Sequence, residues 1–209
     1  MKNIISFLAL SVLFCGSTDA GVLATPRFDT DVYVLVAISH EKEDQLTIGE
    51  SKQGTDNHGH FNVSIIEFDV SKLQREGKKF LRLSAVEYRS DGMPGQQKLS
   101  KKGSTIVQLI ALGETFKDFQ KSENKELWYD THVQNKKVPI VATFKFTDLN
   151  TVTADVTEVV NGWITKGESN KGFALFSTSN NVELGSMTYK DESKRPALVD
   201  DSVKVEDEK

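Results

Sequence analysis

The stretch from Asp155 to Thr178, DVTEVVNGWITKGESNKGFALFST, decides the fold, because it interrupts a chain that otherwise has the pattern of β-strands. It holds Trp163, one of two tryptophans in 209 residues. Its apolar residues have the i, i+3, i+4, i+7, i+8 spacing of a single helix face: Val156, Val159, Val160, Trp163 and Ile164. We therefore predict a short amphipathic helix near residues 156–166. Trp163 then belongs to the core, and a sugar-binding platform is the alternative.

Both ends of this helix carry recognisable signals. Asp155 occupies an N-cap position, and Glu158 three residues later completes the pattern of a capping box. Gly167 is a natural C-terminal stop, and Lys166 in the last turn complements the helix dipole. The following SNKG turns the chain into FALFST, which has the composition of a strand.

The rest of the chain alternates apolar, β-branched runs with turn residues. One run, FNVSIIEFDVS, changes the parity of its apolar positions between Ile65 and Ile66, which indicates either a bulge or a strand buried on both faces. Short strands at this spacing favour a mostly-β, jelly-roll-like antiparallel sandwich over βαβ units. The predicted strands lie at residues 31–39, 44–51, 61–71, 78–90, 104–114, 138–149, 173–179 and 182–189.

Residues 1–20 have the features of a secretory signal peptide. Lys2 provides the positive start, an apolar run follows, and Thr18 and Ala20 are the small residues expected at a cleavage site. The apolar run is too short to favour a membrane span. We expect a secreted, extracellular protein, and lipid anchoring at Cys15 is the alternative, disfavoured by the bulky Phe14 before it.

The length and charge of the chain constrain its organisation and its partners. A chain of 209 residues favours one domain, which we place at residues 21–199. Residues 200–209 are too charged and too poor in apolar residues to pack, so we expect a disordered acidic tail. The formal net charge of -4 argues against a nucleic-acid partner, which would require a basic surplus.

Six motifs in a fixed order resemble the DNRLRE family of secreted bacterial domains, also called carbohydrate-binding module family 96. The similarity runs from Asp31 to Val199 and rests on DVYV, LTIGES, SIIEFDVSKL, DVTEVVNGWITKG, SNKGFALFS and SKRPALV. The resemblance implies a jelly-roll sandwich that binds polysaccharide, with anionic polymers such as alginate among the expected ligands. The chain departs from the family's W-x-E and second Trp in the middle region, where only Glu114 and Trp128 match.

Two sets of residues are candidates for carbohydrate binding. Trp128 and Tyr129 lie in a polar stretch, ENKELWYDTH, and exposed aromatic rings pack on the C–H faces of sugars; a lid over the core is the alternative. A basic set would pair with the carboxylates of an anionic sugar, and a solvated strand and loop face is its alternative. This basic set comprises Arg82, Arg89, Lys98, Lys101 and Lys102.

The sequence shows no nucleophile elbow, zinc helix or phosphate loop, so we predict a protein that is not an enzyme. Glu67 and Asp69 share one strand face and are the pair that a small polysaccharide lyase or hydrolase would use. His58 and His60 are too few ligands for a metal site, so no metal ligands are assigned. No cofactor is expected, although the oxygen-rich loops keep a structural Ca²⁺ as an alternative. A structural or adhesive cell-surface or biofilm-matrix protein is the second functional class.

Overall fold

The computed structural model describes residues 21–33, 38–40, 44–52, 59–89, 99–112, 139–168, 170–177 and 181–202. Thirteen strands and the helix α3 (Thr157–Thr165) occupy most of these ranges. A short 3₁₀ helix, η2 (Glu192–Lys194), lies near the end. The strands are β1 (Val22–Ala24), β2 (Pro26–Tyr33), β3 (Ile38–His40), β4 (Gln45–Lys52), β5 (Gly59–Asp69), β6 (Phe80–Arg89), β7 (Leu99–Ser100), β8 (Ser104–Ala111), β9 (Ile140–Thr147), β10 (Thr151–Asp155), β11 (Asn170–Phe176), β12 (Asn181–Gly185) and β13 (Ala197–Val199).

The strands form one hydrogen-bonded network whose main path is β1-β13-β6-β12-β4-β5-β11-β8-β9. Off this path, β10 and β7 pair with β6, and β2 pairs with β3 and β5. Every ladder that the structure describes is antiparallel. The prediction of a mostly-β, antiparallel sandwich-like fold is therefore confirmed.

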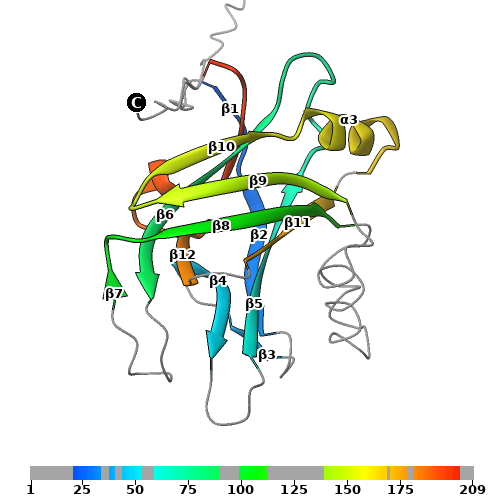
Figure 1. The fold of residues 1–209 in the computed structure, drawn as a ribbon. Coiled ribbons are helices and arrows are strands. Elements are labelled where there is room, and N and C mark those ends of the chain that lie inside the picture. The colour runs from blue at the N-terminus through cyan, green and yellow to red at the C-terminus, as the bar shows by residue number, and fades with distance from the viewer. Residues whose placement is uncertain are drawn as a thin grey trace, which may run out of the picture.

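A turn between β9 and β10 connects the β9 end of this network to β6, near the other end. β9 pairs with β8, whereas β10, which follows directly, pairs with β6. The turn is fixed by Asp148, whose φ of 52° is left-handed, and whose N–H donates to the Gly103 carbonyl at 2.8 Å. The Tyr88 hydroxyl donates to the Asp148 carbonyl at 2.7 Å. Figure 1 shows β9 and β10 side by side across the front of the molecule.

Strand β5 is buried on both faces. It lies between β2 on one side and β11 and β4 on the other, and residues 62–68 are all buried. Its ladder with β11 continues through Ile65 and Ile66 without a register shift. Of the two alternatives that the sequence allowed, burial on both faces is correct, and a bulge at this position is wrong.

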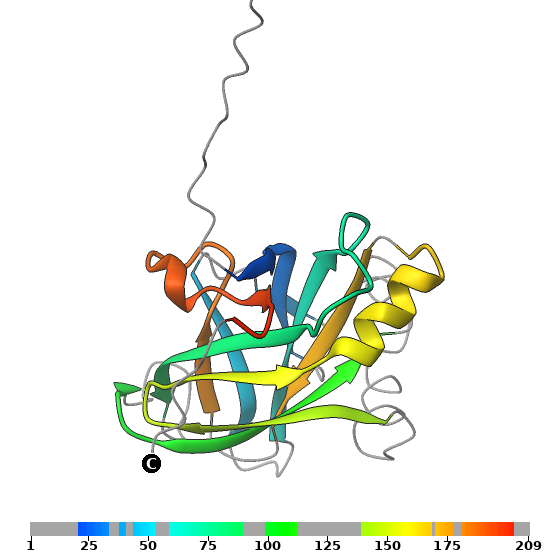
Figure 2. The same cartoon turned by 90° about the horizontal axis from the view of Figure 1, so that it is seen from above.

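Helix α3 packs one face on the core, as the spacing of its apolar residues predicts. Val156, Val160 and Trp163 belong to the core cluster, with Val159 and Ile164 partly buried against it. Trp163 is 6% exposed, and its ring centroid lies 4.9 Å from that of Phe173 in β11. Burial of a large apolar side chain contributes about 2–3 kcal/mol of transfer free energy. Figure 2 shows α3 along one side of the molecule and η2 at the other.

The helix begins one residue later than the sequence predicts. Its N-cap is Val156, no side chain caps it, and Asp155 instead accepts the N–H of Thr157 at 2.9 Å. The cause is a tertiary contact, because the Val156 N–H donates to the Lys79 carbonyl at 2.9 Å and so continues the direction of β10. The expected capping box from Asp155 to Glu158 is therefore corrected to a local turn around the Asp155 carboxylate.

At the C-terminal end of α3 the predicted stop at Gly167 is confirmed, but Lys166 is the C-cap and the last turn of the helix holds no basic residue. Gly167 has a φ of 69°, the left-handed conformation that glycine adopts without steric cost. The Gly167 N–H donates to the Ile164 carbonyl, and the Glu168 N–H donates to the Trp163 carbonyl. This pair of bonds is a Schellman motif, with Lys166 as the C-cap.

The described part of the chain holds no helix with the length and apolar character needed to cross a membrane. Of the predicted tail, residues 200–202 form a turn in which the Asp200 carboxylate accepts the Ser202 N–H at 2.9 Å. The Asp200 N–H also donates to the Gly21 carbonyl at 2.8 Å, which ties this turn to the start of the described chain.

Candidate functional site

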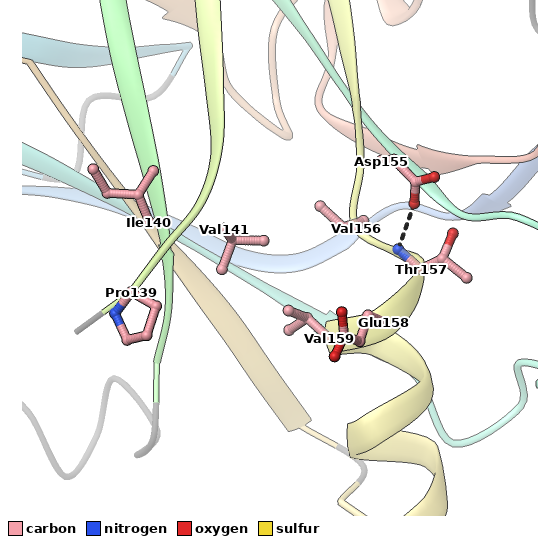
Figure 3. A pocket seen from close by; sticks show the side chains of 8 residues that line it. All are labelled: Pro139, Ile140, Val141, Asp155, Val156, Thr157, Glu158 and Val159. Carbon is pink, nitrogen blue, oxygen red and sulfur yellow. Dashed lines mark hydrogen bonds between the residues drawn. The ribbon is translucent and has the colours of Figure 1, made fainter.

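A cavity of about 610 Å³ opens where β9 and β10 diverge. Ligand pockets in proteins commonly measure about 300–1,000 Å³, so this one has the size of a binding site. Figure 3 shows residues from the start of β9 on one side and residues from the end of β10 and the start of α3 on the other. They are Pro139, Ile140, Val141, Asp155, Val156, Thr157, Glu158 and Val159.

The pocket exists because β9 and β10 belong to different ladders. Their turn at residue 148 holds them together at one end, but beyond it β9 follows β8 and β10 follows β6. Among the described strands no ladder joins β9 to β10. Sheet twist rotates neighbouring strands relative to one another, so the two strands separate towards Pro139 and Asp155. The pocket is thus at the open end of the hairpin.

The walls of the pocket are aliphatic. Ile140 is 41% exposed, one of few large apolar side chains with such exposure in the described ranges. Val141 and Val159 are half-buried and contact the core cluster, and Val156 beneath them is buried. An exposed isoleucine beside partly buried valines offers an apolar surface to a ligand without opening the core.

One rim of the pocket is polar. The Asp155 carboxylate lies there, and hydrogen bonding from Thr157 holds its pKa below the ordinary value, despite an opposing effect of burial. The Thr157 hydroxyl donates to the Lys79 carbonyl at 3.3 Å, and its oxygen accepts the Lys79 N–H at 2.8 Å. These bonds fix the rim to Lys79, the residue before β6, and the exposed Glu158 adds a second carboxylate.

The same rim also offers hydrogen-bond donors. The first N–H groups of any α-helix have no carbonyl partner within the helix. In α3 these include the N–H groups of Glu158 and Val159; the N-cap residue Val156 makes no capping bond, and the Asp155 carboxylate accepts the Thr157 N–H. The pocket therefore presents acceptors and donors next to an aliphatic wall.

The structure does not bring Arg82 and Arg89 together. Arg82 pairs with Thr153 of β10 and Ala197 of β13, and Arg89 lies at the other end of β6 opposite Asn181. Seven residues of extended strand separate them by roughly 23 Å. Arg82 is half-buried, and its Nε atom is buried without a hydrogen-bond partner.

Lys101 and Lys102 are exposed in the turn after β7. The Ser100 hydroxyl donates to the Lys102 carbonyl at 2.9 Å, and the Gly103 N–H donates to the Asp148 carboxylate at 3.1 Å. These lysines are therefore beside the closed end of the β9–β10 hairpin, whereas the pocket is at its open end.

The remaining predicted ligand contacts, Trp128, Tyr129 and Lys98, lie outside the described residues, as does His58. The chain segment that carries Trp128 and Tyr129 rejoins the described structure at Pro139, on the rim of the pocket. Within the ranges that the structure describes, no group of three or more His, Cys, Asp or Glu side chains could hold a metal ion.

The two carboxylates considered for catalysis have structural partners. Glu67 is ion-paired with Arg27 at 3.1 Å, and its side chain is 5% exposed. Opposite it, Gly172 leaves room for this side chain, since a Cβ there would lie 3.0 Å from the Glu67 Cγ and 2.7 Å from the Ile66 carbonyl oxygen. Asp69 accepts the Ser71 N–H and hydroxyl, and these bonds lower its pKa.

Within the ranges that the structure describes, Asp69 and Asp155 are two of four aspartates in Asp-x-Ser or Asp-x-Thr sequences whose carboxylate accepts the N–H two residues later. The others are Asp191 and Asp200. The motif is visible in the sequence, and it predicts these turns more directly than the strand pattern does.

No protein-family model matches the chain, and no curated protein matches it either.

Proposed function

We propose that the protein is a secreted, non-catalytic carbohydrate-binding β-sandwich that recognises a polysaccharide. The observation that carries this proposal is the pocket between β9 and α3, where an aliphatic wall meets hydrogen-bond acceptors and donors. Sugars have the complementary surface, because a pyranose ring presents C–H groups on its faces and hydroxyl groups around its edge. The ordered motifs that resemble carbohydrate-binding module family 96 support the same class of ligand.

The environment of Glu67 and Asp69 supports a non-catalytic role. A general acid in a glycosidase is kept protonated by its surroundings, which raise its pKa. Asp69 has the opposite environment, since the Ser71 bonds lower its pKa. The Glu67 carboxylate is held in place by an ion pair with the Arg27 guanidinium.

A second function is favoured by the free edge of β9. Among the described strands β9 pairs with β8 alone, and an unpaired strand edge can add a strand from another chain. Ile106 on the neighbouring β8 is 52% exposed and enlarges this apolar edge. These features suit a structural or adhesive surface or matrix protein.

Affinity electrophoresis distinguishes the two functions. The protein is run through native gels that contain alginate, pectin or a neutral glucan, with a gel without polymer as the control. Carbohydrate binding predicts retardation in at least one polymer gel. Unchanged mobility in every gel, together with co-purification of a cell-surface protein, would support the structural role and reject the proposal.

Catalysis is tested on the same polymers. Release of reducing ends or unsaturated products would contradict the non-catalytic assignment. If such products form, Glu67→Gln shows whether Glu67 takes part, because it removes the charge and keeps the shape. Loss of the Arg27 ion pair also weakens the fold, so the melting temperature of this variant is measured alongside.

A further inference from the structure

We infer that the pocket between β9 and α3 binds a neutral, hydroxyl-rich sugar unit and not an anionic one. This inference rests on the proposed function and specifies its ligand. It differs from the expectation that a basic edge recognises uronic acids, and it assigns the ligand to Ile140, Val141, Glu158 and their neighbours.

The charge around the pocket disfavours an anionic ligand. The side chains of Asp155 and Glu158 both line it, and hydrogen bonding from Thr157 stabilises the charged form of Asp155. A uronate carboxylate in the pocket would meet two like charges, which costs free energy unless a cation lies between them.

The two lysines next to this rim do not reverse its charge. The Lys79 ammonium is buried and donates to the carbonyls of Arg75, Glu76 and Gly77 at 3.2–3.3 Å, so it points away from a ligand. Lys78 is near enough to affect Asp155, but its ammonium lies over the Phe80 ring, 5.9 Å from the centroid. Neither lysine lines the pocket.

Hydroxyl groups satisfy the polar rim where a carboxylate cannot. A sugar hydroxyl can donate to the Asp155 or Glu158 carboxylate and also accept from the uncapped N–H groups of Glu158 and Val159. An ionised ligand carboxylate can accept hydrogen bonds but cannot donate them. It would therefore bond to the N–H groups, but it would offer no donor to the two protein carboxylates beside it. The rim thus selects a ligand that both donates and accepts.

The aliphatic wall supplies the rest of the recognition. Ile140 is exposed at the mouth of the pocket, and covering its side chain would remove apolar surface from water. Val141 and Val159 are further apolar residues that line the same pocket. The C–H face of a pyranose ring suits such a wall, whereas the charged edge of a uronate does not.

The test uses native gels that contain laminarin or galactomannan as neutral probes and alginate or polygalacturonate as anionic probes, all with EDTA to remove calcium. Ile140→Ser removes the wall, and Ile106→Ser is its control at an exposed isoleucine away from the pocket. Glu158→Lys reverses the charge of the rim, and Glu76→Lys makes the same change at an exposed loop position. Melting temperatures confirm that all four variants fold.

We expect the unmodified protein to be retarded by at least one neutral polymer. Ile140→Ser and Glu158→Lys should each weaken this binding roughly tenfold, the effect of losing one hydrogen bond to a charged group or one apolar contact. Ile106→Ser and Glu76→Lys should bind as the unmodified protein does. Glu158→Lys, but not Glu76→Lys, should gain retardation by alginate.

Three results would overturn the inference. If a neutral polymer retards all four variants equally, the sugar binds elsewhere, and the proposed function stands without this pocket. If only the anionic polymers retard the protein, or if Ile140→Ser weakens alginate binding, the ligand is not neutral. If no polymer retards the unmodified protein, both the inference and the proposed function fail.

Discussion

The two ends of α3 are built differently, although the helix is only nine residues long. At the C-terminal end the carbonyls of Trp163 and Ile164 are bonded by the Schellman motif around Gly167, and the Trp163 ring packs on Phe173. At the N-terminal end the N-cap residue Val156 has no capping side chain, the Asp155 carboxylate accepts the Thr157 N–H, and the first turn lines the pocket. One end therefore closes the core and the other faces a cavity.

This difference separates stability from recognition within one element. Groups whose hydrogen bonds and apolar contacts are satisfied internally stabilise the fold but offer little to a ligand. Groups left unsatisfied at a helix start contribute less to the fold and can bind another molecule. Substitutions at the closed end should therefore change the free energy of unfolding, whereas substitutions at the pocket should change binding.

Trp163→Ala should have the largest effect. It leaves a cavity between α3 and β11 and should lower the free energy of unfolding by about 3–5 kcal/mol, measured by urea denaturation. Ile106→Ala removes an exposed side chain of β8 and should change it by less than about 0.5 kcal/mol. If both variants lose the same small amount, Trp163 does not anchor the helix.

Gly167→Ala should have the next largest effect. An alanine with a φ of 69° is strained, so the free energy of unfolding should fall by about 1–2 kcal/mol. Gly162→Ala is the matched control inside α3, where an added Cβ meets nothing within 4 Å. This control should be neutral or stabilising by up to roughly 1 kcal/mol, since alanine favours helix over glycine. Equal destabilisation by both would exclude a special role for the helix end.

The N-terminal end should respond to acid. The folded pKa of Asp155 is below its ordinary value of 3.8, mainly because of Thr157, so its stabilising effect is complete above that pH and is lost as the pH falls through the lower folded pKa. Asp155→Asn should reduce the free energy of unfolding that is lost in acid by roughly 0.5 kcal/mol. The value is small because solvent screens the exposed carboxylate. Melting temperatures between neutral pH and strong acid measure it.

Gly167→Ala is the control for this pH dependence. It weakens the other end of the helix without a titrating group, so its melting curve should lie below that of the unmodified protein and run parallel to it at every pH. Three further aspartates in the same turn motif also have lowered pKa values, so the Asp155→Asn variant should still lose part of its stability in acid. If Asp155→Asn loses as much stability in acid as the unmodified protein does, the Thr157 bonds do not stabilise the folded state.

The closed end of α3 can be predicted from the sequence because its signals are local. The spacing of five apolar residues places Trp163 in the core, and a glycine after the last of them sets the stop. Most strands follow from alternating patterns for the same reason. The helix start is predicted one residue too early, because it depends on the bond from Val156 to the Lys79 carbonyl, 77 residues away in the sequence.

The pocket cannot be predicted from the sequence, because it depends on which distant strands β9 and β10 join. β10 is absent from the predicted strands, since its five residues precede the helix directly and its ladder with β6 spans a large sequence separation. The separation of Arg82 from Arg89 can be predicted from the sequence, because seven residues of extended strand are longer than the span of one binding site. Two residues on one strand can be close in sequence and still be too far apart to share a ligand.

Ile140→Ser should have the smallest effect on stability. It therefore distinguishes most clearly between binding at the pocket and stability at the closed end of α3. Ile140 is 41% exposed at the mouth of the pocket, and its removal from the surface should change the free energy of unfolding by less than about 0.5 kcal/mol. Urea denaturation beside Ile106→Ser measures this. A loss above about 1.5 kcal/mol would mean that Ile140 packs as a core residue, and the weaker sugar binding of the variant would then follow from damage to the fold. A small loss with weakened binding would instead show that the aliphatic wall serves recognition.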